Sequence, residues 1–276
     1  MSALETNTAR GDARPATTVP AIDMRGVTIG ALRDSKIIVA EDVNWRVEPG
    51  EFWTVAGLHG AGKSDLLMLA AGVMSPVAGS YDFSGEGMPI FSEERLAHRL
   101  KLGLVFDGGR LFGQLTVAEN IALPLRYHRN FPAVAAASAV ATLVEIMDLS
   151  PFASTLPGAL GRNWLRRAAL ARALILKPEV LLLDTPISGL DQREQNWWFS
   201  FLGQLSRGHP YYEGRPVTII VTTANLRNWR GHARRFALLE NGRFTALGDW
   251  AAVERSDDPL VKELIETEKW ESTSSQ

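Results

Sequence analysis

The sequence predicts an α/β fold, and three features carry that prediction. The glycine-rich run GLHGAGKS, residues 57–64, lies between an apolar segment, 51–56, and a segment of helical character. The apolar run 180–183 ends in the carboxylate of Asp184. A third apolar run, 217–221, leads into two threonines. Short apolar runs that alternate with helical segments are typical of buried strands in a parallel sheet.

The glycine-rich run has the form GxxxxGK[ST] of a phosphate-binding loop, in the strand–loop–helix context that supports this reading. Its glycines allow the backbone to curl so that successive N–H groups point toward phosphate oxygens. Lys63 is expected to reach the β- and γ-phosphates, and the Ser64 hydroxyl is expected to ligate Mg²⁺. A plain glycine-rich turn before a core helix does not account for the Lys-Ser pair. The predicted nucleotide-binding residues are Gly57, Leu58, His59, Gly60, Ala61, Gly62, Lys63, Ser64 and Asp65.

Asp184 follows a buried strand, so its carboxylate is expected at the sheet edge where α/β proteins bind ligands. There it can complete Mg²⁺ coordination opposite Ser64, which gives a metal site of these two residues. The alternative, an Asp that caps a turn, is less favoured because the phosphate-binding loop lies upstream. Further on, the run 188–191 precedes a helix expected over 192–205. A hairpin with an Asn-Gly turn is expected over 235–246.

The composition is that of an ordinary globular chain, with 46% hydrophobic and 22% charged residues. The net charge of −2 gives no global basic field, so no nucleic-acid partner is expected. The absence of cysteine excludes disulfides and thiolate metal sites. No segment approaches the roughly 20 apolar residues that span a bilayer.

The order of these segments resembles the ATP-binding subunit of an ABC transporter, over residues 22 to about 250. The resemblance implies a P-loop NTPase fold of ABC type, in which a mixed core sheet has an antiparallel β part and an inserted helical subdomain. The segments that carry the resemblance are the turn 47–51, the Q-loop region 104–120, the helix 166–174 after the signature, and the D-loop Ser188, Gly189, Leu190 and Asp191.

The resemblance also implies an organisation. Residues 1–21 would be a disordered tail, 22–250 the ATP-binding domain with its helical subdomain at about 91–174, and 251–276 a C-terminal helix and tail. The chain would bind ATP and Mg²⁺. It would contact an integral-membrane permease and form a homodimer or a heterodimer with another ABC ATPase. Its place would be cytoplasmic, peripheral on the inner face of the cell inner membrane.

A narrower resemblance concerns Mla/Mce-type lipid transporter ATPases. It rests on residues 119–126 with His128, on 166–172 and on 256–264. Polar amino-acid importers share part of the same pattern, so lipid transport is the favoured reading and not the only one.

Three positions that carry catalysis in the family hold other residues here. The Q-loop glutamine falls at Asp107, whose charge would repel a γ-phosphate. The water-polarising glutamate falls at Thr185, which cannot accept a proton at neutral pH, and loss of a general base costs about 10²–10⁴ in rate. The switch histidine falls at Thr223, so a γ-phosphate contact is lost. No catalytic residue is therefore assigned, and hydrolysis is predicted to be weak or absent.

The family's signature segment, which offers N–H groups to the partner's γ-phosphate, aligns with Leu160, Gly161, Arg162, Asn163 and Trp164. The side chains at the last three positions obstruct the close approach that glycines permit. Asn163 is expected to cap the following helix. Alternatively, Arg162 brings its guanidinium to the phosphate.

Two features predict modest ATP affinity. Asp65 stands where a hydroxyl residue usually touches the α-phosphate, although in the first helical turn it can instead point outward and favour the dipole. No aromatic residue lies near 27–31, where adenine would stack. Three functions stay open: a degenerate transporter subunit, an active ATPase that uses Asp107 or Asp191, and a cytosolic regulatory pseudo-ATPase without a permease.

Overall fold

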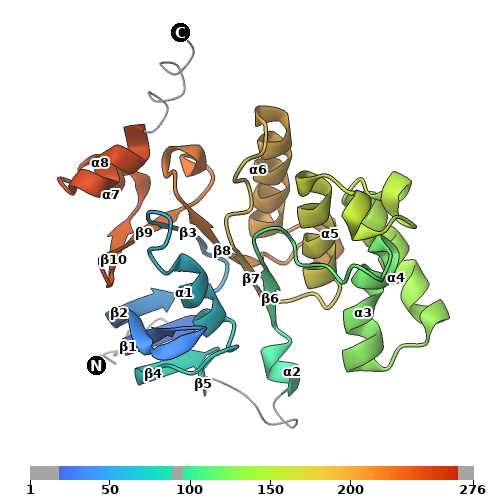
Figure 1. The fold of residues 1–276 in the computed structure, drawn as a ribbon, viewed down its shortest axis with the longest axis horizontal. Coiled ribbons are helices and arrows are strands. Elements are labelled where there is room, and N and C mark those ends of the chain that lie inside the picture. The colour runs from blue at the N-terminus through green and yellow to red at the C-terminus, as the bar shows by residue number, and fades with distance from the viewer. Residues whose placement is uncertain (1–18, 89–95, 267–276) are drawn as a thin grey trace, which may run out of the picture.

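The computed structural model describes residues 19–88 and 96–266, and within them a ten-stranded sheet carries helices on both faces (Figure 1). The strand order is β5-β4-β1-β2-β10-β9-β3-β8-β7-β6. The strands are β1 (Ile22–Ala31), β2 (Asp34–Val47), β3 (Phe52–Ala56), β4 (Ala78–Phe83), β5 (Glu86–Gly87), β6 (Leu102–Val105), β7 (Val180–Leu183), β8 (Thr218–Thr223), β9 (Arg235–Glu240) and β10 (Arg243–Gly248). The α-helices are α1 (Lys63–Ala70), α2 (Leu96–Arg99), α3 (Val117–Arg129), α4 (Ala133–Ile146), α5 (Arg162–Leu174), α6 (Gln192–Arg207), α7 (Trp250–Glu254) and α8 (Pro259–Glu266).

The three apolar runs of the sequence form the central parallel strands. β3 pairs in parallel with β8 and β9, and β7 pairs in parallel with β8 and β6. Every residue of β3, β7 and β8 is buried, as expected for strands covered on both faces. Because these strands run in the same direction, their carboxyl ends lie along one edge of the sheet.

An antiparallel part extends the sheet on the other side. β1 pairs with β2 and β4, β4 pairs with β5, and β2 joins the remainder through a short parallel pairing with β10. β9 and β10 form the expected hairpin. Its turn residues Asn241 and Gly242 both have positive φ, which is what a tight two-residue turn requires. The predicted mixed sheet with an antiparallel part is confirmed.

Helices α3, α4 and α5 gather beyond the β6 edge of the sheet, away from β1, β2 and β4 (Figure 1). Thr116 starts α3 with a capping box, in which it and Glu119 exchange side-chain-to-backbone hydrogen bonds. The apolar faces of these helices share one core with α6. Within the expected subdomain, the short helix α2 precedes residues 102–105, which belong to the sheet as β6, and α3, α4 and α5 follow from Val117 onward.

Both ends of the described chain are tied to the rest of the fold by backbone hydrogen bonds. The Ala21 N–H donates to the Val47 carbonyl at 2.8 Å, so the chain is already anchored before β1 begins. The Leu226 N–H donates to the Leu264 carbonyl at 3.0 Å, which ties α8 to the segment after β8. Residues 1–18 of the tail expected over 1–21, and residues 267–276 at the other end, lie outside the described residues. None of the helices placed in 19–88 and 96–266 has the length and apolar character to cross a membrane.

Candidate nucleotide-binding site

The phosphate-binding loop joins the end of β3 to the start of α1, and its glycines are required by the geometry. A Cβ atom added at Gly57 would overlap the Leu239 carbonyl oxygen, and one at Gly62 would overlap the Val39 side chain. Gly60 and Gly62 have φ values of +81° and +91°, in the left-handed region. The loop is therefore held in one curled path by close packing against β2 and β9.

Lys63 places its ammonium group inside this curl. Its Nζ donates to the carbonyl oxygens of Gly57 and Leu58, each at 2.7 Å. Burial lowers the pKa of Lys63, and the nearby charge of Asp184 opposes that shift. The first N–H groups of α1 have no partner within the helix and carry the positive end of its dipole. Cation and helix end together form an anion-binding site.

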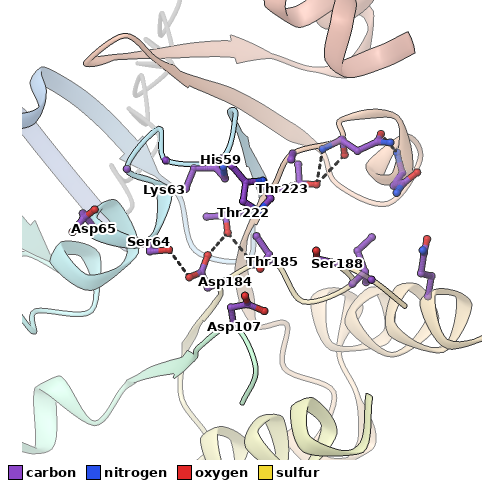
Figure 2. A pocket seen from close by; sticks show the side chains of 18 of the residues that line it. His59, Lys63, Ser64, Asp65, Asp107, Asp184, Thr185, Ser188, Thr222 and Thr223 are labelled. Atoms are coloured by element: carbon purple, nitrogen blue, oxygen red, sulfur yellow. Dashed lines mark hydrogen bonds between the residues drawn. The ribbon is translucent and has the colours of Figure 1, made fainter. Parts of the chain in front are cut away.

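The Asp184 carboxylate accepts hydrogen bonds from two hydroxyl groups, one on α1 and one on β8 (Figure 2). The Ser64 Oγ donates to Asp184 Oδ2 at 2.6 Å, and the Thr222 Oγ1 donates to Asp184 Oδ1 at 2.7 Å. A hydroxyl oxygen and a carboxylate oxygen in contact are the hard donors that Mg²⁺ prefers. The residues present therefore fit the predicted metal site, with Ser64 and Asp184 as ligands.

Thr222 is a site residue that was not predicted from the sequence. It is fully buried at the end of β8, and its hydroxyl also accepts the Thr185 N–H at 3.0 Å. The hydroxyl thus orients the carboxylate of Asp184 and fixes the backbone of Thr185. The available signal was its place at the end of an apolar strand, which in a parallel sheet brings it beside Asp184.

Replacing Thr222 by valine is expected to lower the free energy of unfolding by about 1–3 kcal/mol, because the partly buried Thr185 N–H loses its acceptor. Mg²⁺-dependent ATP binding should weaken as well. Thr54 offers a matched control on the adjacent strand, since it is fully buried and its hydroxyl has no partner in the described chain. Thr54→Val is therefore expected to be neutral or stabilising. Equal losses for the two variants in chemical denaturation would contradict this role of Thr222.

Thr185 and Thr223 lie in the same cavity and offer no proton acceptor at neutral pH. Thr185 has φ +42°, a strained conformation for a β-branched residue. The Thr223 hydroxyl is occupied by Asn225, from whose N–H it accepts and to whose carbonyl it donates, both at 3.0 Å.

Asp107 is neutralised by a buried arginine. Arg166 Nη2 donates to Asp107 Oδ1 at 2.7 Å, and Arg166 Nη1 donates to the Ser188 carbonyl at 2.6 Å. The Arg166 side chain is 3% exposed and that of Asp107 is 60% exposed. The repulsion of a γ-phosphate expected from Asp107 is therefore largely offset by this ion pair, which sequence spacing did not reveal.

The expectation that Asn163 caps α5 is wrong. Gly161 is the N-cap, and Asn163 lies inside the first turn, where its buried Oδ1 accepts from Trp198 Nε1 at 3.1 Å. Arg162 lies against Gly189 of the D-loop, where its guanidinium would collide with a Cβ. Trp164 packs on Phe152, with 4.8 Å between ring centroids. These contacts engage the side chains of Arg162, Asn163 and Trp164 within the chain itself.

Asp65 turns toward the β1–β2 hairpin. Its Oδ1 accepts from the Leu32 N–H at 2.8 Å, which agrees with the outward orientation in the first turn of α1. Beside this hairpin lies a second cavity of about 540 Å³, lined by aliphatic side chains that include Ile37, Ile38 and Leu58. No Phe, Tyr or Trp of the described residues lines it. Modest ATP affinity, expected because no aromatic residue lies near 27–31 to stack on adenine, stays a prediction.

A cavity of about 550 Å³ brings most of these groups together at the carboxyl edge of the sheet (Figure 2). Leu58 and Ala61 line the second cavity, Asp191 caps α6, and the signature-equivalent segment lies outside both. The predicted residues that line the first cavity are His59, Gly60, Gly62, Lys63, Ser64, Asp65, Asp107, Asp184, Thr185, Ser188, Gly189 and Thr223. Those that sequence reasoning did not assign are Arg110, Ile187, Gln195, Thr222, Ala224, Asn225 and Asn228.

The loop, the metal ligands and the cavity together define a P-loop nucleotide-binding protein. Residues 40–188 match the family described as ABC transporter. The chain belongs to this family as an ATP-binding subunit. Members of the family bind ATP, typically with Mg²⁺, dimerise, and work with membrane permease subunits.

Several relatives span most of the chain. The intermembrane phospholipid transport system ATP-binding protein MlaF of Escherichia coli (strain K12) is 29% identical over 89% of this chain and 88% of its own length. The methionine import ATP-binding protein MetN 2 of Rhodococcus jostii (strain RHA1) is 33% identical over 83% of this chain and 66% of its own length. Among solved structures, the dimeric cassette MJ0796 bound to ADP and Pi has a TM-score of 0.70 at 25% identity, over 80% of this chain and 95% of that chain.

Proposed function

We propose that this chain is the ATP-binding subunit of a transporter for phospholipids or similar hydrophobic molecules at the bacterial inner membrane, and that it hydrolyses ATP slowly or not at all. It would lie peripherally on the cytoplasmic face and contact an integral-membrane permease.

The extent of the likeness to MlaF supports the lipid substrate. That likeness covers nearly all of both chains, whereas the more identical methionine-import relative is matched over 66% of its length. The late segment 256–264, which carries part of the sequence resemblance, is an integral part of the fold. Leu260, Val261 and Leu264 are buried, so α8 packs against the rest of the domain.

The proposal of slow hydrolysis rests on one observation: the carboxylates that could accept a proton are already engaged by other groups. Asp107 is paired with Arg166, and Asp184 is engaged by two hydroxyl groups. Thr185 and Thr223 have no basic group. Asp191, the other carboxylate considered for rearranged catalysis, caps α6 by accepting the Glu194 N–H at 2.8 Å. Asp107, Asp184 and Asp191 are therefore each engaged elsewhere and are not free to act as the general base for a water molecule at the terminal phosphate.

The distribution of the altered residues bears on the dimer. In the family each ATP lies between the phosphate-binding loop of one chain and the signature of the other. Thr185 and Thr223 affect the site on this chain's own loop, and the segment 160–164 affects the site on its partner's loop. Both sites of a dimer would thus be altered, whether the partner is identical or a related ATPase.

Nucleotide binding and turnover measured together test this proposal. The full chain should bind a non-hydrolysable ATP analogue in calorimetry, and its ATPase rate should stay well below about 1 s⁻¹, the low end for typical enzymes, with or without its permease. Turnover at or above that rate that is lost in Lys63→Ala would contradict the slow-hydrolysis proposal.

The substrate is tested by mass spectrometry of the detergent-purified subunit–permease complex. Bound phospholipid is expected above the level of a control membrane protein. Binding of methionine in place of phospholipid would overturn the lipid assignment and leave the ATP-binding role standing.

A further inference from the structure

The loop that follows β6 carries Arg110, a cavity-lining residue to which no role has been assigned above. We propose that Arg110 binds the terminal phosphate of the nucleotide and supplies in cis the contact that Thr223 cannot make. The inference rests on the proposed ATP binding, and it assigns a residue and a phosphate to it.

The charges that line the cavity leave room for this role. In the described chain, Lys63 and Arg110 are the lysine and arginine side chains of the lining, against the carboxylates of Asp65, Asp107 and Asp184. Asp107 is balanced by Arg166, which reaches it from outside the cavity lining. A triphosphate with one Mg²⁺ still carries excess negative charge, so a second cation beside Lys63 lowers the electrostatic cost of binding.

The guanidinium of Arg110 is available. Within residues 19–88 and 96–266 it forms no ion pair with a carboxylate, and the residue is exposed. The guanidinium lies over the ring of Phe106, with its Cζ 5.1 Å from the ring centroid. Such stacking orients a guanidinium while leaving its N–H donors open. A planar guanidinium can give a phosphate two parallel hydrogen bonds.

The backbone under Arg110 is held in a strained conformation. Arg110 has φ +44°, in the left-handed region that ordinary side chains avoid, directly after Gly108 and Gly109 with φ +71° and +80°. Arg172 donates to the carbonyl oxygens of Gly109 and Arg110, both at 3.1 Å. A Cβ at Gly109 would come within 2.7 Å of the Leu165 carbonyl. Helix α5 therefore fixes the loop, and a strained residue fixed in a binding cavity is typical of functional sites.

The direction of the loop selects the terminal phosphate. β6 pairs with β7, whose end carries Asp184, the candidate metal ligand expected near the β- and γ-phosphates. The aliphatic cavity suited to a base lies on the other side of the phosphate-binding loop, beside the β1–β2 hairpin. A side chain after β6 thus meets the phosphate end of the nucleotide and not the base.

Calorimetry of the full chain with Mg²⁺ and either a non-hydrolysable ATP analogue or ADP tests the proposal. Arg110→Ala is expected to weaken binding of the ATP analogue about tenfold to a hundredfold, the range for one lost charged hydrogen-bonding group, and to change ADP binding little. Arg110→Lys should recover part of the loss. Arg110→Gly should lose the same ATP preference while its melting temperature stays equal or rises, because glycine relieves the positive φ.

Arg243→Ala serves as the matched control, since Arg243 is exposed on β10 outside this cavity. If Arg110→Ala and Arg110→Gly keep the wild-type preference for the ATP analogue over ADP while Lys63→Ala loses both nucleotides, the role of Arg110 is wrong and ATP binding stands. If the wild-type chain binds neither nucleotide, the proposed function fails as well.

Discussion

Replacing Lys63 by alanine is expected to weaken ATP binding by a hundredfold or more. Its ammonium group lies inside the loop, held by the carbonyl oxygens of Gly57 and Leu58 in the absence of an anion. A bound triphosphate would take over these donors. Each charged hydrogen bond contributes about 1.5–3 kcal/mol, so the loss of two costs about 3 kcal/mol or more. Titration calorimetry with an ATP analogue measures the effect.

Lys262→Ala is the control for this substitution, because Lys262 is an exposed lysine of α8 that pairs with Asp257 far from the loop in sequence. It should bind ATP as the unmodified chain does. Lys63→Ala is also expected to lower the melting temperature somewhat, because the buried Gly57 carbonyl oxygen loses its donor. Unchanged ATP binding in Lys63→Ala would refute the phosphate-binding loop itself.

Replacing Trp198 by alanine is expected to lower the free energy of unfolding by about 3–5 kcal/mol. Trp198 lies on α6, and its ring is fully buried in the core that α6 shares with α3, α4 and α5. Its Nε1 donates to the buried side-chain amide of Asn163. The substitution therefore creates a cavity and also removes a hydrogen bond. Differential scanning calorimetry should show a fall of roughly 10 °C in melting temperature.

Two further variants separate these effects. Trp198→Phe keeps most of the ring volume and loses the donor, so its cost should fall to about 1–3 kcal/mol. Trp250→Ala removes a partly exposed indole whose Nε1 bonds to Glu254 in the same short helix, and it should cost less than Trp198→Ala. Similar losses for Trp198→Ala and Trp250→Ala would show that Trp198 does not anchor Asn163 and α5 as described.

Local patterns were sufficient to predict the sheet and the phosphate-binding loop. A short continuous apolar run in an α/β fold is typical of a central strand that is covered on both faces, and β3, β7 and β8 are such strands. The Asn-Gly turn of the β9–β10 hairpin was readable for a similar reason, since few residues tolerate its backbone.

The contacts between distant segments could not be read in the same way. Asp107 looked like an isolated negative charge because Arg166, its partner, lies 59 positions away on another element. Asn163 had the residue type of a helix cap, but the chain begins α5 at the preceding glycine and Trp198 takes the amide. Which side chain meets which is set by the packing of α5 and α6, and a single sequence does not record that.

The ion pair of Asp107 with Arg166 also limits the routes by which the sequence can change. Replacing Asp107 alone by a neutral residue such as glutamine would leave an almost fully buried cation without its counter-charge, which is costly. A stable exchange requires a second substitution at Arg166 at the same time. Positions 107 and 166 are thus expected to change together in evolution, because a change at Asp107 alone passes through a less stable protein.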